Sequence, residues 1–229
     1  MRISAESVFY EHLLCISILL CTFIWKELEK QRMETITLRQ ARLEDAQAIL
    51  DIYAPYIRNT NITFEYEVPT LPEFRKRMEE IMEGYPYLIC EINGAAAGYA
   101  YAHRYKERAA YQWDAELSVY LDERYARRGI GRAFYTALME ILKEQNVRNV
   151  YGIVTSPNPP SEALHTAMGF RLFGVSRKTG YKLGRWIDVS GFERPIGDPD
   201  SPPGELLLID RVEPERIAEI LKEAERLIH

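Results

Sequence analysis

The chain has 229 residues, of which 47% are hydrophobic and 28% are charged, with a formal net charge of −5 at pH 7. This length suits one domain with a well-formed core, and the composition is ordinary for a globular protein. The negative charge argues against nucleic acid as a partner, because domains that bind it are usually basic. The three cysteines and four histidines lack the spacing of disulfide frameworks and zinc sites, so we expect a cytoplasmic location and no metal.

Residues 13–25 form a nearly uninterrupted apolar run. The run is shorter than the ~20 residues that a membrane-spanning helix needs, and no basic start or small-residue cleavage site marks a secretory signal. Three interpretations of residues 1–32 stay open. They are a translation start placed upstream of the real one at Met33, an extra helix packed on the domain or a second subunit, or a membrane anchor.

Beyond Met33, the spacing of apolar residues predicts alternating strands and helices. Strands are expected over residues 36–41, 87–92, 95–103, 113–121, 150–155, 170–175 and 186–192. Helices are expected over residues 46–57, 70–84, directly after the glycines at 129 and 131, and over 160–168 and 214–228. Thr70 with Glu73 predicts a capping box, and Asn93-Gly94 predicts a hairpin turn. This order predicts an α/β sheet of mixed direction with helices on its faces.

A glycine turn connects the strand at 113–121 to the helix that follows it. The turn contains Arg127, Arg128, Gly129, Ile130, Gly131 and Arg132. Glycines allow close approach of a ligand, and the first N–H groups of a helix favour a phosphate group. The turn lacks the Gly-Lys-Ser/Thr of a Walker loop and the third glycine of a dinucleotide fingerprint. Read alone, it is equally typical of a tight turn with exposed arginines.

A second polar cluster follows the strand at 150–155. It runs from Pro157 through Asn158 and Ser161 to His165 and closes on Gly169-Phe170. Because it also begins at a strand end, we expect it to open beside the glycine turn, where ligands bind in open α/β sheets. Taken separately, Ser161 suits a helix cap and His165 suits a buried, hydrogen-bonded histidine.

Together these segments resemble the GNAT acetyltransferase superfamily, whose phosphate loop reads Q/R-x-x-G-x-G/A and whose later segment reads N-x-x-A/S-x-x-L-Y-x-x-x-G-F. Within it, the chain is similar to the phosphinothricin and methionine sulfoximine N-acetyltransferase family. The blocks that carry this similarity are residues 98–102, 105–113, 116–120, 157–161, 164–165, 169–170, 180–182 and 184–189. Two positions depart from the general pattern: Ala126 replaces Q/R, and His165 stands at the usual tyrosine, as it does in the phosphinothricin-type branch.

The resemblance implies a GNAT fold, with a mixed, mostly antiparallel twisted sheet flanked by helices on both faces. It covers the region that we expect to form the acetyltransferase domain, residues 33–195, and leaves an extension over 1–32 outside. Composition and apolar spacing predict a linker and an amphipathic helix over 196–229. The resemblance implies acetyl-CoA as co-substrate, a small amino-acid-like acceptor and a homodimer. Membrane and nucleic acid are not expected as partners.

Roles for individual residues also come from the resemblance. Glu116 would act as general base in a ternary complex, and His165 would protonate the departing thiolate or assist the base. The residues expected to bind acetyl-CoA are Val119, Tyr120, Leu121, Arg127, Arg128, Gly129, Ile130, Gly131, Arg132 and Asn158. The residues expected to bind the acceptor are Phe64, Lys106, Arg108 and Tyr111, with Lys182 as a further candidate.

Simpler interpretations and rival functions stay open at this point. Glu116 is also compatible with a water-facing glutamate at a strand edge, and Lys106 and Arg108 with solvated loop charges. The chain is also compatible with a GNAT enzyme acting on another amine, such as a polyamine, an aminoglycoside or a protein N-terminus. A non-catalytic acyl-CoA-binding module is the alternative from another class.

Overall fold

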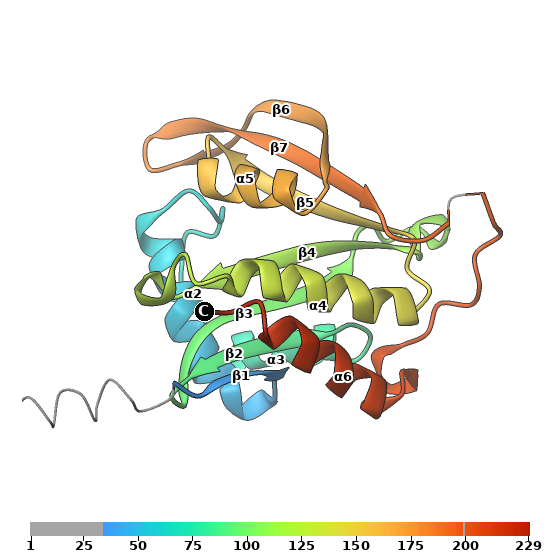
Figure 1. The fold of residues 1–229 in the computed structure, drawn as a ribbon. Coiled ribbons are helices and arrows are strands. Elements are labelled where there is room, and N and C mark those ends of the chain that lie inside the picture. The colour runs from blue at the N-terminus through green and yellow to red at the C-terminus, as the bar shows by residue number, and fades with distance from the viewer. Residues whose placement is uncertain (1–33, 199) are drawn as a thin grey trace, which may run out of the picture. The chain divides into compact units, whose positions relative to one another are not determined.

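Seven strands form one sheet in the part of the chain that the computed structural model describes, residues 34–198 and 200–229. The strands are β1 (Ile36–Gln40), β2 (Tyr87–Ile92), β3 (Ala95–Arg104), β4 (Asp114–Leu121), β5 (Asn149–Ser156), β6 (Arg171–Lys182) and β7 (Arg185–Pro195). Their order is β1-β2-β3-β4-β5-β7-β6, and every neighbouring pair is antiparallel except β4 and β5 (Figure 1). The expected mixed, mostly antiparallel sheet is confirmed.

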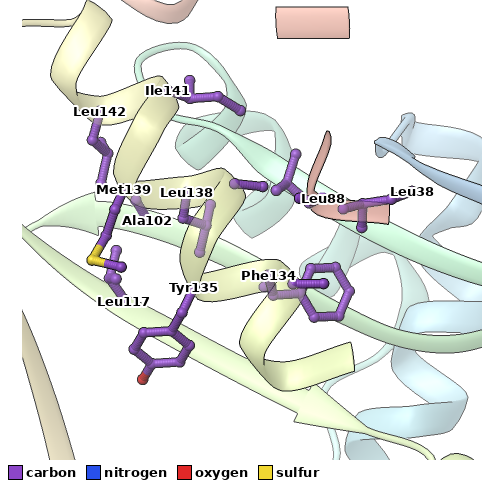
Figure 2. Packing of buried hydrophobic residues seen from close by; sticks show 14 of the residues in the cluster. Leu38, Leu88, Ala102, Leu117, Phe134, Tyr135, Leu138, Met139, Ile141 and Leu142 are labelled. Carbon is purple, nitrogen blue, oxygen red and sulfur yellow. The ribbon is translucent and has the colours of Figure 1, made fainter. Parts of the chain in front are cut away.

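Helices cover both faces of this sheet. They are α2 (Ala46–Asn59), α3 (Leu71–Met82), α4 (Ile130–Glu144), α5 (Pro159–Ala167) and α6 (Pro214–Glu225). Leu88 of β2 belongs to the apolar cluster under α4 and α6, whereas its neighbours Tyr87 and Ile89 belong to the cluster under α2 and α3. Successive side chains of a strand point to opposite faces, so β2 supports both helix layers. Figure 2 shows the α4 side of this core, where Phe134 and Leu138 of α4 belong to the same apolar cluster as Leu88.

Local sequence signals account for several of these boundaries. The Thr70 side chain accepts from the N–H of Glu73, and the Glu73 carboxylate accepts from the N–H of Thr70 at 2.8 Å, so the capping box at the start of α3 is confirmed. Asn93 and Gly94 both adopt positive φ angles, 53° and 78°, as a tight hairpin between β2 and β3 requires.

Two expected boundaries were wrong. β6 continues to Lys182 instead of ending near residue 175, and most of its side chains are exposed on both faces. A strand of that kind lacks the apolar alternation that would reveal it in the sequence. The helix expected over 214–228 ends at Glu225, and the chain continues through turn-like hydrogen bonds to His229.

The compact unit that contains the sheet runs from Ile36 to His229, so it includes α6 as well as the sheet. The apolar run at residues 13–25 lies outside the described residues. Among the helices in residues 34–198 and 200–229, none combines the length and apolarity needed to cross a membrane.

Candidate active site

A cleft opens where β4 and β5 separate. The two strands pair in parallel only from Asp114 opposite Asn149 to Glu116 opposite Tyr151, although they continue to Leu121 and Ser156. Beyond Glu116, residues 117–121 and 153–155 line opposite walls of a cavity of about 390 Å³. α4 and α5 both begin at this open end (Figure 1). The separation leaves one edge of β4 beyond the reach of β5, so a ligand arm can lie against it as an added strand would.

The glycine turn lies at the mouth of the cleft and starts α4. Arg127 and Gly129 adopt left-handed conformations, with φ angles of 64° and 80°, and α4 begins at Ile130. Gly131 lines the cavity, and a Cβ there would lie 3.1 Å from the Leu164 side chain. The first N–H groups of a helix need partners from outside the helix, and the helix dipole favours an anion there. This end of the cleft therefore fits the pyrophosphate of a nucleotide-bearing ligand.

The three arginines of the turn differ in their surroundings. Arg127 and Arg132 are exposed, whereas Arg128 is half-buried and its Nε donates to the main-chain oxygen of His229 at 2.6 Å. Arg127 and Arg132 thus stand at the surface near the helix start, and Arg128 connects the turn to the residues after α6.

Glu116 is the last β4 residue that pairs with β5, and the cavity wall begins at Leu117. Its side chain is 23% exposed and lies beside His103 of the neighbouring strand β3, with 3.9 Å between Glu116 Oε1 and His103 Nε2. Burial raises the pKa of Glu116, and the positive charge of a protonated His103 opposes that rise. A carboxylate with a raised pKa beside a cleft is suited to accept a proton near neutral pH.

His165 is 2% exposed and both of its ring nitrogens have partners. Nδ1 lies 2.8 Å from the carbonyl oxygen of Ser161, which can only accept, so Nδ1 carries the proton. Nε2 is then an acceptor, and the hydroxyl of Tyr135 donates to it at 2.8 Å. Burial lowers the pKa of His165, while its hydrogen bond to Ser161 opposes that shift. A neutral imidazole bonded to a tyrosine hydroxyl thus stands in the cavity wall.

Gly152 of β5 makes room for this histidine. A Cβ at position 152 would lie 2.1 Å from His165 Nε2 and 2.7 Å from Cδ2. Any larger residue at this position would displace the imidazole.

The residues expected to bind the acceptor lie outside the described cavity wall. Phe64 packs its ring on Gly180 of β6, where an added Cβ would be 2.2 Å from Phe64 Cζ. Lys106 Nζ lies 4.7 Å from the ring centre of Tyr111, in a cation–π contact, and Arg108 is exposed beside them. The structure thus brings Lys106 and Tyr111 together. It places Phe64 elsewhere, packed against the β6–β7 hairpin.

A family model described as an acetyltransferase (GNAT) domain matches residues 38–190. The chain belongs to the GNAT acetyltransferase family. The matched region contains the whole cleft, the glycine turn, Glu116 and His165. It ends before α6, so the acetyltransferase carries a C-terminal helix beyond the part that defines its family.

Known proteins similar to this acetyltransferase include enzymes named for small amino-acid acceptors. The phosphinothricin N-acetyltransferase of Streptomyces viridochromogenes is 36% identical over 167 residues, which cover 73% of this chain and 91% of that protein. The L-methionine sulfoximine/L-methionine sulfone acetyltransferase of Salmonella typhimurium is 26% identical over 168 residues, covering 73% of this chain and 98% of that protein. A solved phosphinothricin acetyltransferase from Sinorhizobium meliloti, in complex with acetyl-CoA, has 35% identity and a TM-score of 0.73, covering 78% of this chain and 98% of that one.

Two tyrosines at the site of this acetyltransferase were missed by sequence reasoning. Tyr135 shares the apolar face of α4, so its spacing signals only a core residue. The Tyr56 hydroxyl donates to the carbonyl oxygen of Leu121 at 2.6 Å and lies 3.3 Å from the N–H of the same residue. Leu121, an expected contact of the acetyl-CoA arm, therefore already has Tyr56 as its backbone partner.

Asn158 and Lys182 have structural partners of their own. Asn158 caps α5 by accepting from the N–H of Ser161 at 3.4 Å, and it also lines the cavity of the acetyltransferase. Lys182 is 3% exposed and its Nζ donates to the carbonyl oxygen of Thr63 at 2.7 Å. Burial lowers the pKa of Lys182, and Glu65 opposes that shift. Within residues 34–198 and 200–229, no three His, Cys, Asp or Glu side chains form a group suited to a metal ion.

Proposed function

We propose that this enzyme transfers the acetyl group of acetyl-CoA to the amino group of a small amino-acid-like acceptor of the phosphinothricin or methionine sulfoximine type. The observation that carries the proposal is the cleft between β4 and β5. It ends at the glycine turn, has the Tyr135–His165 pair in its wall, and begins directly after Glu116, where β4 stops pairing with β5. Relatives named for each of these acceptors match this chain over more than 90% of their own length. They support the choice of acceptor.

Acetyl-CoA fits the two ends of this cleft. The backbone groups of Gly129, Ile130 and Gly131, at the start of α4, would bind the pyrophosphate, and Arg127, Arg128 and Arg132 would add positive charge. Val119, Tyr120 and Leu121 would lie along the pantetheine arm, with Asn158 on the opposite wall. The co-substrate supplies the acetyl thioester, and the chain's own residues orient it and move protons.

Glu116 would begin the reaction by taking a proton from the acceptor ammonium, directly or through a water molecule. The neutral amine then forms the new C–N bond with the thioester carbonyl carbon. The backbone N–H of Val119, which points away from β3 as that of Leu121 does, would stabilise the oxyanion that develops. When the C–S bond breaks, the electron pair leaves with sulfur and a proton must reach the thiolate.

The hydrogen bonds of His165 refine its expected role. Its Nε2 carries no proton and accepts from the hydroxyl of Tyr135, and both residues line the cavity. We propose that the Tyr135 hydroxyl turns from His165 Nε2 to give its proton to the departing thiolate, with His165 holding the hydroxyl in place beforehand. The attacking nitrogen loses its second proton as the amide forms, and this proton returns to Tyr135 through water in the cleft. Direct transfer without an acyl-enzyme fits Cys90, because this thiol is buried and burial raises its pKa to about 12.

The enzyme is further proposed to act in the cytoplasm as a homodimer. β6 is an edge strand, and it exposes Leu172 and Phe173, with Trp186 exposed on the neighbouring β7. Exposed apolar side chains on an edge strand favour association with a second copy. Light scattering in solution should give twice the chain mass, and Trp186→Glu combined with Phe173→Glu should give a monomer. A monomeric wild-type protein would contradict this assembly.

A panel of acceptors tests the proposed function. Thiol release from acetyl-CoA is measured with L-phosphinothricin, L-methionine sulfoximine, ordinary amino acids, spermidine, kanamycin and a peptide N-terminus. We expect kcat/KM to be highest for the first two compounds. Turnover of the polycationic amines alone would contradict the proposed acceptor. Binding of coenzyme A with no turnover of any amine would instead favour a non-catalytic module.

A further inference from the structure

The segment after the acetyltransferase domain returns to the glycine turn. α6 buries one face against α4 and β1 through Ile217, Ile220, Leu221 and Ala224 (Figure 1). The Glu225 carboxylate at its end accepts from the N–H of Leu38 in edge strand β1 at 3.2 Å. These contacts aim the following residues, 226–229, at the start of α4.

Three contacts join those residues to the turn. The N–H of His229 donates to the carbonyl oxygen of Arg128 at 3.0 Å, and Arg128 Nε donates to the main-chain oxygen of His229 at 2.6 Å. The carbonyl oxygen of Leu227 occupies the space beside Gly129, 2.2 Å from where a Cβ would stand. Between these two residues, Ile228 is 7% exposed and anchors the segment in the main apolar cluster.

The turn needs such support because its backbone is unusual. Arg127 and Gly129 both have positive φ, which an L-residue such as arginine adopts at a cost and which surrounding contacts must hold. A turn that fluctuated would have to become ordered when a ligand binds, and ordering weakens binding. Residues 227–229 contact Arg128 and Gly129, which lie between the strained Arg127 and the first helical N–H groups.

We propose that residues 227–229 are a positioning element of the acetyl-CoA site, which holds the glycine turn in the conformation that binds pyrophosphate. This inference rests on the proposed function, because it assumes that the turn receives the pyrophosphate. The segment lies outside the region that the family model matches. The turn of this enzyme is therefore supported by residues that the family pattern does not include.

A comparison of two acetyl donors tests the inference. S-acetylpantetheine carries the same thioester as acetyl-CoA but no pyrophosphate or nucleotide. A variant that ends at Arg226 should show a KM for acetyl-CoA raised on the order of 10-fold, as the loss of order at one or two residues implies. Its kcat/KM with S-acetylpantetheine should match that of the full chain. Ile228→Ala, which keeps the chain length, should shift the KM for acetyl-CoA in the same direction by a smaller factor.

Met78→Ala is the matched control, because Met78 is 1% exposed in α3 on the opposite face of the sheet. It should lower the melting temperature and leave the KM for acetyl-CoA unchanged. An unchanged KM for acetyl-CoA in the shortened variant would overturn the inference, as would an equal loss with both donors, which indicates general damage. A lower KM for acetyl-CoA in the shortened variant would also overturn the inference, because residues 227–229 would then compete with acetyl-CoA for the turn. If the full chain itself uses both donors equally well, the proposal that the glycine turn binds pyrophosphate is contradicted, independently of the role of residues 227–229.

Discussion

Substitution of Gly152 by alanine tests whether the position of His165 controls turnover. An added Cβ would lie 2.1 Å from His165 Nε2, whereas real Cβ contacts are essentially never below 3.0 Å. The imidazole must therefore move by roughly 1 Å or more, which removes its 2.8 Å hydrogen bond to Tyr135. A displacement of about 1 Å at a reacting centre can cost about 100-fold in rate, so we expect kcat to fall by about that factor. Overpacking should lower the free energy of unfolding by about 1–3 kcal/mol.

The assay compares kcat at saturating acetyl-CoA and acceptor with chemical denaturation of the same variant. Gly174→Ala is the control, because nothing lies within 4 Å of a Cβ added there. It should leave both kcat and stability close to the wild-type values. If Gly152→Ala kept kcat within twofold of wild type while its stability fell, His165 would be a packing residue and the proposed role would be refuted.

Three further outcomes follow from contacts in and around the site. Tyr135→Phe removes the proposed proton donor, so it should lower kcat on the order of 100-fold with little change in the KM of either substrate. An unchanged kcat in steady-state assays would exclude Tyr135 as the donor. Lys182→Met removes the hydrogen bond to the carbonyl oxygen of Thr63, which precedes Phe64. It should raise the KM for the acceptor about 3- to 10-fold and leave the KM for acetyl-CoA unchanged. Equal changes in the two KM values would contradict this. Burial lowers the pKa of His165, so the unfolded chain binds its proton more readily and wild-type stability should fall as pH drops through about 6.5. Thermal unfolding of His165→Gln between pH 7 and 5 should show a smaller loss than wild type, and an equal loss would disprove the contribution.

Features that depend on short stretches of sequence could be predicted. Thr70 and Glu73 lie one helical turn apart and fix the start of α3, and Asn93-Gly94 sets the hairpin through its positive φ angles. The composition of the glycine turn alone indicates a possible phosphate site. In each case the interacting groups are neighbours in the chain, so their pattern is visible in the sequence.

Features that depend on distant residues could not be predicted. Tyr135 and His165 are 30 positions apart, and helical spacing marks Tyr135 only as a core residue. The separation of β4 from β5 is a property of two strands together, whereas each strand alone reads as an ordinary apolar run. The contacts between Arg128 and His229 join positions 101 residues apart, and His229 takes part only through its main-chain N–H and oxygen, so the residue type at position 229 gives no signal of them.

The pH dependence of kcat/KM for wild type and Glu116→Gln, with L-phosphinothricin or L-methionine sulfoximine as acceptor, tests the central claim most directly. Since burial raises the pKa of Glu116, wild-type activity should fall as pH drops through that raised pKa, where the base becomes protonated. Glu116→Gln should lose most activity at pH 7, keep its affinity for coenzyme A and approach wild type only at alkaline pH, where the acceptor amine is already neutral. A variant with wild-type turnover and the same acidic limb would show that another group is the base.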